Sequence, residues 1–178
     1  MMMITGERYN PHYLHQQHTY DRNNPPPAVN AIVCFSGRGL AFIHLFTDEL
    51  NSKLLIQILK QNLIEGVNKL YTKGEHWALL WDNDSTHTSA ETERWLQSGC
   101  TQIVHIPSHS PDLNIAENLF ADLTPRVEKH NAKTVEELKQ AILQEWTKTD
   151  PQLLKRMSDS MVTRCKEVVA SSGHKINH

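Results

Sequence analysis

The strongest constraint on the fold is a short apolar run, residues 76–81, that ends directly at an acidic residue, Asp82. This run follows the turn-forming pair Lys73-Gly74, so it predicts a buried strand with Asp82 at its carboxyl end. A second carboxylate, Glu117, comes after 34 intervening residues, just inside a predicted helix. That interval accommodates one helix and one strand, which can return the chain to the same end of a sheet. The two carboxylates are therefore predicted to lie near each other.

Carboxylates at strand ends and helix starts suit hard divalent cations, because Mg²⁺ binds a few carboxylate oxygens and keeps water or phosphate in its other positions. A pair of such ions activates an attacking oxygen and stabilises a leaving oxygen in phosphodiester chemistry. We interpret Asp82 and Glu117 as ligands of a catalytic metal site of this kind.

Two structural alternatives stay open for these acids. Asp82 begins the run Asp-Asn-Asp-Ser, whose side chains can bond their own backbone in a turn. Glu117 stands three residues after Asn114, so the pair fits a capping box at the start of a helix. On these readings the chain is an unrelated α/β protein and neither acid is catalytic.

The composition bounds the class of protein. A chain of 178 residues with 39% apolar residues can build the core of one domain. Its formal charge of −2 excludes a strongly basic nucleic-acid-binding domain. The amino terminus has no apolar core of a signal peptide, and no apolar run is long enough for a membrane span, so we expect no membrane partner.

Residues 1–28 are predicted to form a polar arm rich in His and Pro that buries little apolar surface. Within it, His12, His15 and His18 recur every three residues, a spacing that converges on a metal only in a helix or a suitable turn. The segment shows no helical periodicity, so we assign these histidines no metal.

The ordered domain is predicted to occupy residues 29–178 and to be of the α/β class. A proline at position 125 predicts that the helix carrying Glu117 ends or kinks near Leu123. A capping box opens a further helix at Thr134, and the last third of the chain is helical. The expected elements are strands over 29–35, 40–46, 76–81 and 101–106 and helices beginning near 51, 89, 114, 134 and 150.

Two sequence blocks carry a resemblance to a known family. Residues 82–89, DNDSTHTS, resemble the block "DNDPKHTS" of the Tc/mariner superfamily of DDE transposases, and residues 110–119, SPDLNIAENL, resemble its block "SPDLNPIENLW". The spacing of 34 residues is similar to that of the Tc branch. Residues 6–13 resemble a family segment between its first and second strands, and Arg164-Cys165 resembles a pair near its carboxyl end.

The resemblance implies an RNase H-like mixed sheet flanked by helices. It implies DNA cleavage and strand transfer with Mg²⁺ or Mn²⁺, with Asp82 and Glu117 as the second and third acids of a triad. The implied partners are transposon-end and target DNA and further copies of the chain, and the implied location is the nucleus.

The sequence departs from the family at its amino end. The family's first Asp lies on its first strand, upstream of the segment that residues 6–13 resemble, and neither Asp21 nor Asp48 is a credible substitute. We therefore expect the sheet to lack its first strand, which would leave an unpaired edge, and we expect the amino-terminal helix-turn-helix to be absent. This chain alone is expected to be inactive. The alternative function is a non-catalytic transposon-derived remnant that binds nucleic acid or protein.

Overall fold

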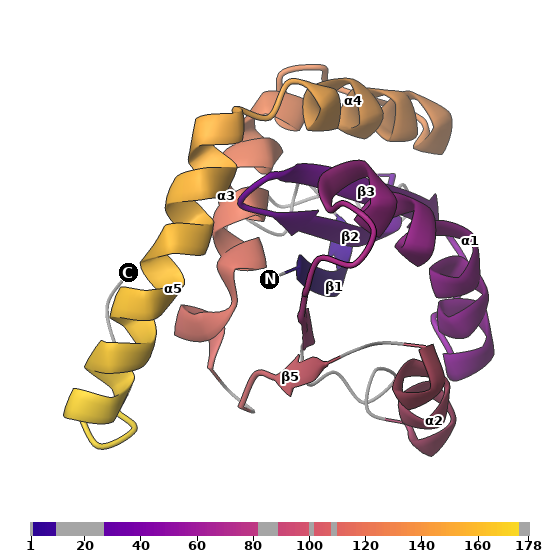
Figure 1. The fold of residues 1–178 in the computed structure, drawn as a ribbon. Helices are drawn as coiled ribbons and strands as arrows, with labels where there is room; N and C mark the ends of the chain where they lie inside the picture. Colours follow the sequence, from indigo (N-terminus) through magenta and orange to yellow (C-terminus); the bar gives the residue numbers. More distant parts are fainter. Residues whose placement is uncertain (1, 10–26, 82–88, 100–101, 108–109, 175–178) are drawn as a thin grey trace.

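A computed structural model describes residues 2–9, 27–81, 89–99, 102–107 and 110–174. Within those residues the chain forms strands and helices in mixed order (Figure 1). The elements are β1 (Met2–Tyr9), β2 (Val29–Ser36), β3 (Gly39–Phe46), α1 (Ser52–Leu70), β4 (Leu79–Trp81), α2 (Ala90–Gly99), β5 (Ile103–His105), the 3-10 turn η1 (Pro111–Leu113), α3 (Ile115–Glu128), α4 (Val135–Thr147) and α5 (Pro151–Ala170).

The strands form one mixed sheet in the order β3-β2-β1-β4-β5. Strand β1 pairs antiparallel with β2, from Met2 opposite Ser36 to Tyr9 opposite Val29. On its other edge β1 pairs parallel with β4, where Ile4 lies opposite Trp81. Strand β4 covers the last three residues of the predicted run 76–81, and β5 continues the sheet in parallel.

The prediction of a missing first strand was wrong, because β1 fills the centre of the sheet. The predicted arm is corrected accordingly: residues 2–9 belong to the sheet, while residues 10–26, with His12, His15 and His18, lie outside the described residues. The low apolar content of residues 1–28 as a whole conceals a short apolar run, Met1 to Ile4, at its beginning. A central strand also gains backbone hydrogen bonds on both edges, which composition does not report.

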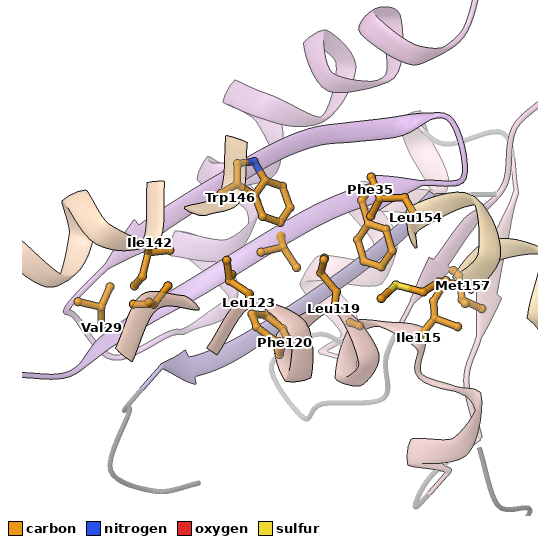
Figure 2. Close-up of a cluster of buried hydrophobic side chains, with 14 of the residues drawn as sticks. Val29, Phe35, Ile115, Leu119, Phe120, Leu123, Ile142, Trp146, Leu154 and Met157 are labelled. Atoms are coloured by element: carbon orange, nitrogen blue, oxygen red, sulfur yellow. The ribbon is translucent and has the colours of Figure 1, made fainter. Parts of the chain in front are cut away.

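Helices cover both faces of the sheet (Figure 1). In β2, Val33 and Phe35 pack toward α3, α4 and α5, whereas Ile32 and Cys34 pack toward α1 and α2. This alternation follows the period of two in a strand, and both sets are buried because both faces are covered. Figure 2 shows the first set, where Phe35 lies among side chains of α3, α4 and α5.

The prediction that helix α3 ends near Leu123 was wrong, since the helix continues through Pro125 to Glu128. The alternative, a kink near Leu123, stays a prediction. An interior proline costs about 3 kcal/mol or more. Leu123 and Val127 are 0% and 1% exposed in the same cluster, so apolar burial on both sides of the proline offsets that cost. The predicted caps of other helices are confirmed, namely Asn51 for α1, the Thr134–Glu137 capping box for α4 and Asp150 for α5.

A buried carboxylate joins the end of α3 to α4. Glu145 of α4 accepts hydrogen bonds from Lys148 Nζ at 2.8 Å and bonds His130 Nε2 at 2.9 Å, and Arg126 Nη1 lies 3.4 Å from its Oε2. The hydrogen bonds from Lys148 and then His130 are the main reasons that the Glu145 pKa is lowered to about 2. The turn between α3 and α4 is therefore held by charge as well as by packing.

We predict that this carboxylate supports stability above its unfolded-state pKa of 4.5 and that the support is lost as pH falls from about 4.5 to about 2. Urea unfolding of the wild type and of Glu145→Gln across that range measures the effect. The variant should be less stable at pH 7 and should show a flatter acid limb. Equal slopes in both proteins would contradict the prediction.

The turn between β2 and β3 packs tightly against α5. A Cβ added at Gly37 would lie 2.8 Å from Ser158 Cβ, closer than carbon atoms approach without movement. We predict that Gly37→Ala lowers the free energy of unfolding by about 1–3 kcal/mol through overpacking. Gly99→Ala is the matched control, since nothing lies within 4 Å of an added Cβ there. Equal stability of the two variants in urea titrations would contradict this packing.

Candidate active site

The candidate site is built at the end of β4, between β1 and β5. Trp81, the last residue of β4, is fully buried, and its carbonyl accepts a hydrogen bond from Ile106 N at 2.9 Å. The end of this strand is therefore held in the sheet on both sides. Asp82 follows Trp81 in the chain but lies outside the described residues, so its predicted role as a ligand stays a prediction.

Glu117 is the third residue of α3 and is exposed. The helix begins at Asn114, whose Oδ1 accepts a hydrogen bond from Ala116 N at 3.1 Å and whose carbonyl accepts one from Glu117 N at 3.1 Å. The Asn114 N–H donates to the Pro111 carbonyl at 3.1 Å. In a capping box the Glu117 carboxylate would instead accept the hydrogen bond from the Asn114 N–H. The capping-box alternative for Glu117 is therefore wrong, although Asn114 does cap the helix.

The Glu117 carboxylate is exposed and could accept a ligand. Among the residues that the structure describes, it makes no hydrogen bond and no ion pair. An exposed, ionisable oxygen donor at the start of a helix fits a hard divalent cation by its chemistry. No three His, Cys, Asp or Glu side chains come together in the described part of the chain, so the described residues alone do not form a complete metal site.

The beginning of α3 and the end of β4 contribute side chains to one buried cluster. Leu80 belongs to the same buried cluster as Ile115 and Leu119, which lie on either side of Glu117 in the helix. Figure 2 shows Ile115 and Leu119 on the inner side of α3, facing the sheet. Leu80 stands two residues before Asp82, so the segments that precede Asp82 and surround Glu117 both contribute to the cluster on this face of the sheet.

The sequence did not predict the contacts that support this region. Arg164 of α5 was noted in the sequence only because Arg164-Cys165 resembles a family pair. In the structure its guanidinium donates hydrogen bonds to Asp112 and Asn118, on either side of Glu117. His105, at the end of β5, lies 3.7 Å from Glu93 of α2 and joins that helix to the sheet edge. No local spacing signals either contact, since each joins residues distant in sequence.

The mixed sheet with helices on both faces is of the RNase H-like class, and comparison with known proteins shows the family. The family model described as DDE superfamily endonuclease matches residues 3–139. The chain belongs to this family. Its resemblance to Tc/mariner transposases is confirmed as well.

Curated relatives match part of the chain. The Tcb1 transposase of Caenorhabditis briggsae is 28% identical over 101 residues, which are 57% of this chain and 37% of that protein. The Tc3 transposase of Caenorhabditis elegans is 34% identical over 99 residues, 54% of this chain and 30% of that protein. The chain thus spans about a third of the length of these relatives.

Solved structures share the fold. The catalytic domain of Mos1 mariner transposase superposes with a TM-score of 0.79 at 18% identity, covering 98% of this chain and 84% of that one. A structure of the same domain with Raltegravir and Mn has a TM-score of 0.78 at 19% identity, with the same coverage. The Mos1 paired-end complex with Mn covers 99% of this chain and 56% of that chain, with a TM-score of 0.79.

Two substitutions separate the capping role from the ligand role at this helix start. We predict that Asn114→Ala lowers the free energy of unfolding by about 1 kcal/mol, because Ala116 N loses its acceptor. Glu117→Gln should change it by less than about 0.5 kcal/mol, since the carboxylate has no described contact to lose. Chemical denaturation at neutral pH measures both values. A large loss in Glu117→Gln would return this residue to a structural role.

Proposed function

We propose that this chain is the catalytic domain of a DNA transposase, in which Asp82 and Glu117 hold Mg²⁺ or Mn²⁺. The observation that carries the proposal is the start of α3, where Asn114 caps the helix and leaves the Glu117 carboxylate exposed. The divalent ions would supply activation of the attacking oxygen and neutralisation of the leaving oxygen. Relatives named as transposases, and Mos1 structures named with Mn and Mg, support this choice.

The substrate proposed for this site is transposon-end DNA, followed by target DNA in strand transfer. Structures of Mos1 with a transposon end and in a strand transfer complex support this choice. Assembly of several copies of the chain on DNA is part of the same proposal. We further propose nuclear location, which follows from the proposed reaction on chromosomal DNA.

We propose that this chain cleaves DNA poorly, because β1 brings no Asp to the centre of the sheet. Its sequence, MMITGERY, contains one acidic residue, Glu7. Ile4 pairs with Trp81, the last residue of β4. Thr5 is the next residue of β1, and Asp82 is the next residue of the chain after Trp81. Thr5 is therefore the position at which an added carboxylate is expected to complete a three-acid site.

A nicking assay with Mn²⁺ on supercoiled DNA tests this function. We predict slow nicking by the wild type, a clear gain in Thr5→Asp, and loss of that gain when Asp82→Ala or Glu117→Ala is added. Glu65→Ala, which removes an exposed acid of α1, is the matched control and should retain the gain. Equal DNA binding by all variants, with no Mn²⁺-dependent nicking by any of them, would instead indicate a remnant that only binds DNA.

A further inference from the structure

A buried guanidinium stands behind the helix that carries Glu117. Arg164 of α5 is 6% exposed, although arginine is rarely buried without partners. Its Nε donates to Ser160 Oγ at 3.0 Å, its Nη1 to the Asp112 carbonyl at 2.7 Å and its Nη2 to Asn118 Oδ1 at 2.8 Å. These acceptors offset the cost of removing the charge from water.

The acceptors of Arg164 Nη1 and Nη2 lie on either side of Glu117 in the sequence. Asp112 lies in η1, the turn that leads into α3, and Asn118 is the residue directly after Glu117. Because a guanidinium is a planar fork with fixed donor directions, bonding both acceptors fixes the turn relative to the first turn of the helix. The segment between these acceptors contains Asn114, the cap, and Glu117.

The orientation of the fork is itself determined by α5. Ser160 stands one helical turn before Arg164, and its hydroxyl donates to the Met157 carbonyl at 2.7 Å while accepting from Arg164 Nε. Met157 and Met161 of the same helix are buried in the cluster that contains Ile115 and Leu119. The guanidinium is therefore anchored on a packed helix, so it can hold the turn in place.

Glu117 depends on this support because its side chain has none of its own among the described residues. A metal ligand must be held in one position to bind with full affinity, and outer groups that orient ligands affect metal affinity strongly. Here the backbone does the holding, through the Asn114 cap on one side and Arg164 on the other.

We propose that Arg164 is a positioning residue for Glu117, holding η1 and the first turn of α3 in the geometry that metal binding requires. The inference rests on the proposed function. It assigns a role to α5, which lies beyond the residues 3–139 matched by the family model. A lysine cannot replace the arginine fully, because a single ammonium does not present the planar fork that reaches both Asp112 and Asn118.

The test compares Arg164→Met and Arg164→Lys with Leu59→Ala, a core variant of α1 that lowers stability from the other buried cluster, away from the guanidinium. Amide hydrogen exchange is followed in the metal-free full chain at Leu113, Asn114, Ala116 and Glu117. Mn²⁺ affinity is followed by water proton relaxation. In Arg164→Met we expect these amides to exchange faster and the Mn²⁺ dissociation constant to rise by about 10-fold to 100-fold. Arg164→Lys should give exchange rates and an Mn²⁺ dissociation constant between those of the wild type and Arg164→Met. This variant can still be compared with the wild type if Arg164→Met does not fold.

Two outcomes would overturn the proposal. One is exchange in the Arg164 variants equal to that in Leu59→Ala, which would make the effect one of general stability. The other is faster exchange with unchanged Mn²⁺ affinity. If the wild type itself binds no Mn²⁺, the proposed function fails, and the exchange arm alone then decides whether Arg164 holds the Glu117 turn.

Discussion

The pairing of β1 on both of its edges is the interaction on which the rest of the structure depends. Strand β1 joins the antiparallel pair β2 and β3 to the parallel pair β4 and β5. Without it, β4 would have three residues and one neighbour, too little to hold the strand end next to Asp82. The position of the candidate site therefore follows from backbone hydrogen bonds that involve none of its acids.

The face of the sheet that bears α3 shows how packing and polar contacts divide their tasks. Apolar burial of Ile115, Leu119 and Leu123 decides which side of α3 meets the sheet and so turns Glu117 outward. Burial is non-directional, however, and cannot fix a turn to within a fraction of an ångström. That precision comes from directional bonds, the Asn114 cap and the Arg164 fork.

The sequence predicted what is local or periodic and missed what depends on distant pairing. The hairpin after Val29, the caps at Asn51 and Thr134 and the helix start before Glu117 were predictable, because each is encoded within a few residues. The central position of β1 was not, because its hydrogen-bond partners come 20 or more residues later. The passage of α3 through Pro125 and the contacts of Arg164 escaped prediction for the same reason.

The stability of this fold and its chemistry place separate demands on the same strand. The pairing of β1 uses main-chain groups, which every residue other than proline supplies, so the strand can form without any acid. A metal site instead needs a carboxylate at a given register position, and MMITGERY offers no Asp. The sheet of this family can therefore form whether or not β1 carries an Asp. For the same reason, likeness of fold does not establish activity, which depends on the acids at individual positions.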